Sequence, residues 1–87
     1  MYIVYVLFSE RYNKTYVGYT SNLEDRIKSH NELATKGYTV HYRPWIVAFT
    51  EVYSTKTAAM KREKALKAGQ GRQYIKEQLL KLGLISA

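Results

Sequence analysis

Cysteine is absent from the 87-residue sequence, which excludes disulfide bonds and the thiolate zinc sites of zinc fingers. Proline occurs once and glycine five times, so no internal stretch has the composition of a flexible linker, and the length suits one compact domain over residues 1–87. The longest apolar run, Met1–Phe8, is too short to span a membrane and has no basic leader of a signal peptide. We therefore expect a single domain that acts in the cytoplasm and not at a membrane.

Acidic residues are also few, since seven Asp and Glu stand against fourteen Lys and Arg, giving a formal charge of +7. A positive surface attracts polyanions and releases their condensed counterions on binding. Nine tyrosines and one tryptophan add rings on which bases could stack, although several of these rings must belong to the core. The charge would also suit solubility or association with the ribosome. Composition nevertheless favours nucleic acid as the partner.

The hydrophobic pattern predicts an α+β fold with the element order β-β-α-β-α-α. Residues 2–8 and 15–20 are rich in β-branched and aromatic side chains and predict a hairpin, which a strand over 45–53 would extend to a small, mainly antiparallel three-stranded sheet. Helices are expected to flank this sheet. Their predicted positions are from Ser21 to about 33–37, from Ser54 or Thr55 to Gly69, and from about Arg72 to Leu82, with a loop over 37–44.

Tyr5 and Tyr16 lie on the two strands of the predicted hairpin. A turn centred between Glu10 and Arg11 would place the two tyrosines directly opposite each other, with both phenols on one face. A register shift of two residues would keep them diagonal neighbours on that face, whereas a shift of one would separate them. The phenols either form part of a site or pack as an ordinary cross-strand aromatic pair, and the pattern leaves both interpretations open.

Glu63 interrupts an apolar stripe on the predicted second helix. The stripe consists of Ala59, Met60 and Leu66. Burial of an unpaired carboxylate costs several kcal/mol, so Glu63 must be paired, reach solvent at the edge of the stripe, or hold a metal ion. Neighbouring Lys64 and Lys67 offer the simpler alternative of a surface ion pair worth less than ~1 kcal/mol. Both interpretations stay open.

The first predicted helix carries a further candidate residue, Arg26. Ser21 and Glu24 form a capping-box pattern at its start, and Arg26 and His30 are four residues apart on one face. Most helix arginines are solvated, so Arg26 is a candidate site residue only because of the other functional groups expected near it. A guanidinium, a carboxylate able to hold Mg²⁺ and a phenol able to accept a proton through water are the groups that phosphodiester hydrolysis needs.

Several short motifs, in order along the chain, resemble the GIY-YIG nuclease superfamily. Ile3-Val4-Tyr5 stands where GIY would be, Tyr16-Val17-Gly18 stands where YIG would be, and Arg26 and Glu63 follow. The chain is most similar to the small stand-alone endonucleases with a URI domain. The segments that carry this similarity are Tyr16-Val17-Gly18-Tyr19-Thr20, Asn22-Leu23-Glu24-Asp25-Arg26, His30-Asn31, Tyr38-Thr39, Arg43-Pro44 and Arg62-Glu63. Together they cover the chain from Tyr2 to about Lys67.

The resemblance implies roles for individual residues. Glu63 would bind one divalent cation, Mg²⁺ or Mn²⁺, and Arg26 would contact the scissile phosphate. Tyr5 and Tyr16 would line the site, and one of them would act as, or help to position, the general base. His30 is available to assist, because an imidazole titrates in the right range, although a solvated histidine at the helix end is an equal alternative.

Two departures from the family pattern bear on activity. Many members carry a lysine three residues after the YIG tyrosine, where this chain has Tyr19. Some members place an asparagine after the metal-binding glutamate, and no asparagine follows Asn31 here. The resemblance therefore defines the fold more firmly than the activity.

The segment 36–43 combines basic and aromatic side chains and is predicted to grip a nucleic-acid strand near the site, or else to be a loop with buried aromatic anchors. Its candidate contacts are Lys36, Tyr38, Thr39, His41 and Arg43. The predicted function is a metal-dependent endonuclease in DNA repair or processing, acting on branched or damaged DNA, with a protein partner or a second copy as a source of specificity. The alternatives are a non-catalytic nucleic-acid-binding module and a protein-interaction domain on the same scaffold.

Overall fold

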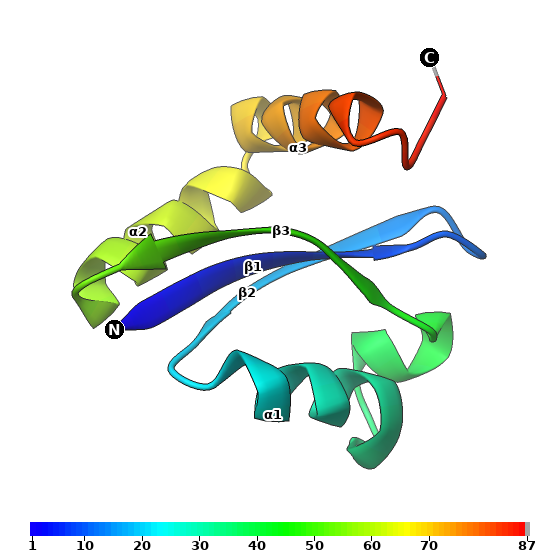
Figure 1. Cartoon of the computed structure of the whole chain (residues 1–87), viewed down its shortest axis with the longest axis horizontal. Coiled ribbons are helices and arrows are strands. Elements are labelled where there is room, and N and C mark those ends of the chain that lie inside the picture. Colours follow the sequence, from blue (N-terminus) through cyan, green and yellow to red (C-terminus); the bar gives the residue numbers. More distant parts are fainter. Residues whose placement is uncertain (87) are drawn as a thin grey trace.

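The computed structural model describes residues 1–86, in which three strands form one antiparallel sheet (Figure 1). The strands are β1 (Tyr2–Ser9), β2 (Lys14–Thr20) and β3 (Ile46–Tyr53), in the order β2-β1-β3. The helices are α1 (Leu23–Lys28), α2 (Lys56–Lys67) and α3 (Gly69–Lys81), with a π-helix η1 (Ser29–Leu33) and a 3-10 helix η2 (Tyr38–Tyr42) between α1 and β3. The predicted α+β order is confirmed, and η2 occupies most of the predicted loop.

The central strand β1 is covered on both faces, as its continuous apolar run predicted. Val4, Val6 and Phe8 point to the face that α2 and α3 cover, whereas Tyr5 and Leu7 point to the opposite face, beside Trp45 and α1. These five β1 side chains are all buried. The alternation of side chains along one strand therefore creates two cores, one on each face of the sheet (Figure 1).

The hairpin register differs from the expected one by two residues. Leu7 pairs with Tyr16, and Tyr5 pairs with Gly18, so the predicted direct pairing of the two tyrosines is wrong. The turn lies later in the chain because Asn13 supplies its left-handed residue, with φ of 53°, a conformation that asparagine tolerates better than most residues. Tyr5 and Tyr16 are still diagonal neighbours on one face, and their ring centroids are 6.4 Å apart.

The start of α1 also differs from the prediction. Asn22, and not Ser21, caps the helix, because its side chain accepts a hydrogen bond of 3.2 Å from the backbone N–H of Asp25. The backbone N–H of Asn22 in turn donates to Thr20 Oγ1 at 3.0 Å, which anchors the bend from β2 into the helix. At α2 the prediction is confirmed, since the hydroxyl of Thr55 caps the helix.

The two C-terminal helices meet at a glycine. The last helix begins at Gly69 and not at Arg72, and Gly71 lies inside it. A side chain at Gly71 would overlap the backbone of Ala65 and Leu66, so the glycine allows the first turn of α3 to approach the end of α2 closely.

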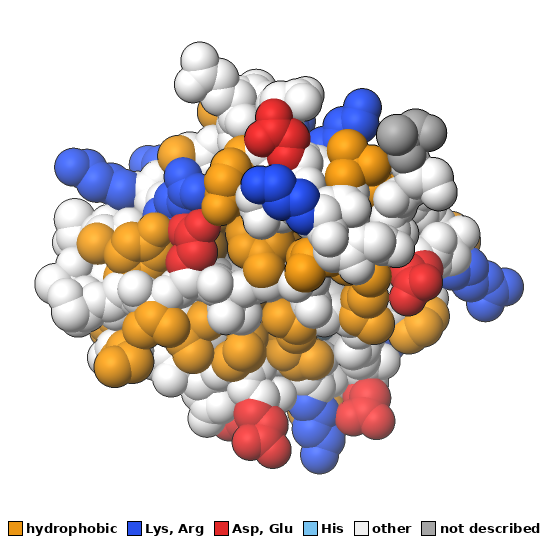
Figure 2. Space-filling model, turned by 45° about the horizontal axis from the view of Figure 1, so that its top comes forward, with side chains coloured by type: hydrophobic (Ala, Val, Ile, Leu, Met, Phe, Trp, Pro, Cys, Tyr) orange, Lys and Arg blue, Asp and Glu red, His pale blue; other side chains and the backbone are white. Residues whose placement is uncertain are grey.

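The exposed surface contains apolar as well as charged side chains. Hydrophobic side chains form a band across the face shown in Figure 2, and the exposed apolar residues include Ile46, Val47 and Val52 of the edge strand β3. Met60 is 39% exposed, so it lies beside the buried stripe of α2 and not within it as predicted. Within residues 1–86, no helix is long and apolar enough to cross a membrane.

Candidate active site

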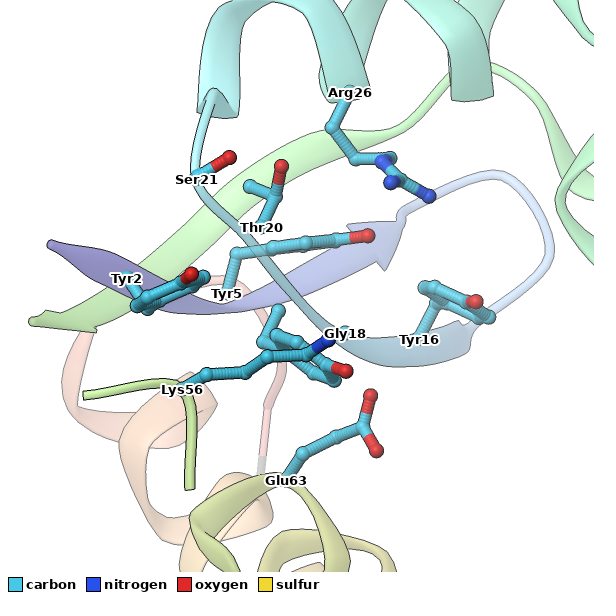
Figure 3. Close-up of a pocket in the computed structure, with 10 residues that line it drawn as sticks. Tyr2, Tyr5, Tyr16, Gly18, Thr20, Ser21, Arg26, Lys56 and Glu63 are labelled. Atoms are coloured by element: carbon cyan, nitrogen blue, oxygen red, sulfur yellow. The ribbon is translucent and has the colours of Figure 1, made fainter. Parts of the chain in front are cut away.

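A pocket of about 490 Å³ lies at the outer edge of β2, the end strand of the sheet (Figure 3). Side chains from both faces of the sheet line it, because α1 approaches this edge from one face and α2 from the other. Arg26 comes from α1, Glu63 from α2, Tyr5 from β1 and Tyr16 from β2. The structure thus brings four of the predicted site residues to one pocket.

Gly18 of β2 is required by the position of Tyr5. The Tyr5 ring lies across this glycine, and a Cβ atom at residue 18 would overlap the phenol ring and its hydroxyl. The glycine of the Tyr16-Val17-Gly18 motif therefore provides the space in which the Tyr5 phenol reaches the pocket (Figure 3).

The Tyr5 phenol is hydrogen-bonded to His30. The Tyr5 hydroxyl lies 2.8 Å from His30 Nε2, and the other ring nitrogen, Nδ1, lies 3.0 Å from Thr39 Oγ1. The His30 residue is only 7% exposed, so the alternative of a solvated histidine at the helix end is wrong. A buried imidazole with both nitrogens occupied has a defined orientation, and it can exchange a proton with one partner.

The electrostatic surroundings keep the Tyr5 and His30 pair uncharged. Burial raises the pKa of Tyr5 far above its usual value, Tyr16 and Glu63 add to the rise, and Arg26 opposes it. Burial lowers the pKa of His30, and the guanidiniums of Arg26 and Arg43 lower it further. At neutral pH we therefore assign a protonated phenol that donates to Nε2, with Nδ1–H donating to Thr39.

Arg43 holds the backbone that carries His30. Its Nε donates to the carbonyl of His30 at 2.6 Å, and its Nη2 donates to the carbonyls of Ala34 at 2.8 Å and Ser29 at 3.3 Å. These carbonyls lie along and just after the short helix η1, where few donors of the helix itself remain. Two of the three guanidinium nitrogens of Arg43 are therefore occupied by the protein's own backbone, and its nucleic-acid contact stays a prediction.

Thr39, in contrast, is not a surface contact. It is 6% exposed, and its hydroxyl is the partner of His30. The other three predicted strand contacts are exposed: Lys36, Tyr38 and His41. Of these, Tyr38 stacks on Tyr16 with ring centroids 6.1 Å apart, so η2 extends the site at that end.

Glu63 combines features of both interpretations of its place on α2. Lys67 Nζ lies 3.8 Å from Glu63 Oε1, a long ion pair that holds the carboxylate weakly. The Glu63 side chain is nevertheless only 20% exposed and points into the pocket (Figure 3). The carboxylate is thus available to a ligand in the pocket.

Lys56 is a pocket residue that the sequence pattern did not single out. Its side chain extends into the pocket above Glu63 (Figure 3). The signal that could have found it is the spacing of seven residues between Lys56 and Glu63, which places both on the same face of α2.

The donor set of the pocket fits a divalent cation that is shared with a bound phosphate. Among residues 1–86, no group of three or more His, Asp or Glu side chains comes together, and Glu63 is the one carboxylate among the described residues that line the pocket. Mg²⁺ is commonly held by one or two carboxylates together with substrate phosphate and water oxygens. The site therefore suits a cation whose ligands come mainly from the substrate and solvent.

The sequence that forms this sheet and pocket matches a known class of catalytic domain. The model of the GIY-YIG catalytic domain matches residues 1–76, which include every residue of the pocket. The chain therefore belongs to the GIY-YIG family, a nuclease superfamily whose nucleases act on DNA.

Relatives with similar sequences cover most of the chain. A UPF0213 protein of Staphylococcus haemolyticus is 39% identical over 64 residues, which are 74% of this chain and 78% of the relative. The UPF0213 protein YazA of Bacillus subtilis is 40% identical over 68 residues, or 75% of this chain and 69% of the relative. A UPF0213 protein of Bacillus licheniformis is 40% identical over 76 residues, or 84% and 77%. No solved structure matches the chain.

Proposed function

We propose that this chain is a metal-dependent endonuclease that hydrolyses a DNA phosphodiester bond in the pocket at the edge of β2. The observation that supports this most strongly is the convergence of Arg26, Glu63 and the two phenols, from four different elements, on one open pocket. Hydrolysis of a phosphodiester uses all three kinds of group.

The basic side chains of the pocket would bind and orient the phosphate. The guanidinium of Arg26 has a planar fork of donors that matches two phosphate oxygens, and Lys56 adds a second positive charge from the opposite helix. Glu63 would hold Mg²⁺ or Mn²⁺, and the chemistry that this cation supplies when bound is charge neutralisation at the phosphate oxygens. The three side chains would thus keep a strand in place with one phosphate above Tyr5.

The Tyr5 and His30 pair would remove the proton from the attacking water. As the water oxygen forms its bond to phosphorus and the bond to the leaving oxygen breaks, the water proton passes to the Tyr5 oxygen. The phenol proton passes at the same time to His30 Nε2, along the existing hydrogen bond of 2.8 Å, and the leaving oxygen takes a proton from solvent water. This relay avoids a free tyrosinate, which the raised pKa of Tyr5 disfavours. Tyr16, beside His30, would position the water or the phosphate.

A cleavage assay with labelled single-stranded, duplex and branched DNA, in Mg²⁺ and then in EDTA, tests the proposal. We expect strand cleavage in Mg²⁺ only, and a loss of about 10²-fold or more in rate for both Glu63→Ala and Arg26→Ala. The matched controls are Glu77→Ala on α3 and Lys28→Ala on α1, which replace exposed residues outside the pocket and should cut at close to the wild-type rate.

Two outcomes would contradict the proposal. Wild-type cleavage by both pocket variants would show that the site lies elsewhere. DNA binding without metal-dependent cleavage would instead identify a non-catalytic nucleic-acid-binding module. The cellular role that we propose, DNA repair or processing, is consistent with the basic surface and with an open pocket that can accept a branched or damaged strand.

A further inference from the structure

Four tyrosines form a continuous row that begins at the pocket and ends at the hairpin turn, and we call this row the aromatic strip. Its members in spatial order are Tyr16, Tyr38, Tyr42 and Tyr12. The successive ring centroids are 6.1, 4.9 and 5.5 Å apart. Because Tyr16 lines the pocket, a strand bound there reaches the strip without leaving the protein surface.

The strip is partly open to solvent. Tyr38 is 45% exposed and Tyr12 is 42% exposed, although each of these rings also contacts Tyr42. Single exposed tyrosines need no explanation, but an adjoining group of exposed rings next to a candidate active site is typical of a binding surface. Packing of η2 against the hairpin accounts for Tyr42 and Tyr16, which are half-buried, and leaves the exposure of the other two unexplained.

Positive charge accompanies the rings. The Arg11 guanidinium lies 5.5 Å from the centre of the Tyr12 ring, and Lys14 Nζ lies 5.6 Å from that of Tyr42. At the pocket end, Lys67 Nζ lies 5.9 Å from the centre of the Tyr16 ring. Cations spaced along a row of aromatic rings are complementary to a nucleic-acid strand, whose phosphates and bases alternate in the same way.

We propose that the aromatic strip binds unpaired nucleotides next to the phosphate in the pocket, so that the substrate class is DNA with a single-stranded segment. This inference rests on the proposed function, because it assumes that the pocket holds a DNA phosphate. The faces of bases are accessible to aromatic rings only when the bases are unpaired or unstacked, whereas duplex DNA presents its base edges and its backbone. The strip offers ring faces and cations, so it selects the single strand.

Binding is measured by fluorescence anisotropy in EDTA, so that cleavage does not affect the result. The probes are a labelled single-stranded oligonucleotide, a blunt duplex of the same sequence, and the same duplex with a single-stranded overhang. We expect the single strand and the overhang to bind more tightly than the blunt duplex. Tyr38→Leu and Tyr12→Leu should each weaken single-strand binding by about tenfold, and change duplex binding by less than about twofold.

Two further variants make the test specific. Tyr38→Phe keeps the ring and should bind the single strand within about twofold of the wild type, since stacking does not need the hydroxyl. Tyr74→Leu on α3 removes a tyrosine that is 36% exposed but lies outside the strip, and should leave single-strand binding unchanged. Circular dichroism confirms that each variant is folded, and Tyr12, at the exposed turn, provides the test if Tyr38→Leu does not fold.

The proposal is overturned if blunt duplex and single strand bind equally, or if the folded leucine variants bind the single strand as the wild type does. It is also overturned if Tyr38→Phe is as weak as Tyr38→Leu, because the hydroxyl and not the ring would then be the contact. The same DNAs in Mg²⁺ separate the two proposals. If the leucine variants lose single-strand binding but the wild type does not cleave DNA, the strip proposal is supported and the nuclease proposal is contradicted. If the wild type and the leucine variants cleave all three DNAs equally, the nuclease proposal is supported and the strip proposal is contradicted.

Discussion

The phenol ring of Tyr5 lies across Gly18, its partner on the neighbouring strand, and this contact connects the two tyrosine motifs of the sequence. The absence of a side chain at residue 18 lets the ring of a β1 residue cross β2 and line a pocket at the sheet edge. The same position brings the Tyr5 hydroxyl within 2.8 Å of His30. Gly18 is therefore part of the geometry of the candidate active site, although it contributes no functional group.

Gly18→Ala tests this relationship. The added methyl group must displace the Tyr5 ring, which breaks its alignment with His30, and we expect the cleavage rate to fall by at least about 10²-fold. Overpacking of the buried ring should also lower the free energy of unfolding by about 1–3 kcal/mol. The measurements are single-turnover cleavage and urea denaturation.

Gly69→Ala is the matched control for this variant, because a side chain at residue 69 would meet no atom within 4 Å. It should cut DNA like the wild type and be equally stable or slightly more so, since alanine favours a helix by about 1 kcal/mol over glycine. A Gly18→Ala protein with the wild-type cleavage rate would mean that the position of the Tyr5 ring does not matter for activity.

The second prediction concerns the protonation of His30. Burial, with Arg26 and Arg43 nearby, lowers the pKa of this imidazole below its usual 6.5, so His30 should stay neutral in mildly acidic solution. The proton relay needs a neutral imidazole, and cleavage should therefore decline only as the pH falls through this lowered pKa. An NMR titration of the imidazole nitrogens measures this pKa directly.

Arg26→Ala should raise the pKa of His30, because it removes a positive charge that disfavours the imidazolium. Lys28→Ala, on the same helix, serves as the control, since Lys28 is not among the charges that lower this pKa. A His30 signal that titrates at or above 6.5 in the wild type would contradict the buried, neutral imidazole on which the relay depends.

The third prediction concerns stability in acid. Arg62 donates to both carboxylate oxygens of Glu51, at 2.7 and 3.1 Å, and Tyr53 donates a further hydrogen bond of 2.8 Å. The hydrogen bonds from Arg62, foremost, lower the pKa of the Glu51 carboxyl below its usual 4.5. The ion pair therefore stabilises the fold above pH 4.5, and this stabilisation is lost as the pH falls through the lowered pKa.

Glu51→Gln should remove that part of the pH dependence and lower the free energy of unfolding at pH 7 by about 1 kcal/mol, as expected for a partly exposed bidentate pair. Urea denaturation at pH 7, 5 and 3 measures the difference. Glu77→Gln, an exposed residue of α3, is the control and should parallel the wild type. If Glu51→Gln keeps the full acid sensitivity, other carboxyl groups are responsible.

Local sequence patterns predicted the features that depend only on residues within one segment. The unbroken apolar run of β1 predicted a strand covered on both faces, and the hydroxyl of Thr55 predicted the start of α2. The choice between neighbouring capping residues was missed, because Ser21 and Asn22 can both cap a helix. The bend at Thr20, where its hydroxyl accepts from the N–H of Asn22, decided in favour of Asn22.

Features that join distant segments were predicted less completely. The motif order led to Tyr5, Tyr16, Arg26 and Glu63, which meet in one pocket. The predicted hairpin register was wrong by two residues, because the register depends on the left-handed conformation of Asn13. The basic and aromatic character of segment 36–43 left open whether its side chains are exposed contacts or buried anchors. In the structure Thr39 is buried beside His30, and Arg43 donates to backbone carbonyls of and just after the short helix η1, which lacks enough donors of its own.

The sequence by itself determined the element order, the basic charge and four residues of the candidate site, because periodicity, charge and motif spacing are properties of the chain. Only the tertiary structure decided that His30 is buried against Tyr5, that Lys56 shares the pocket with Glu63, and that four tyrosines form one strip. These relationships depend on how α1, α2 and η2 pack around the edge of β2. Distances between segments far apart in the chain are set by that packing, and no local spacing contains them.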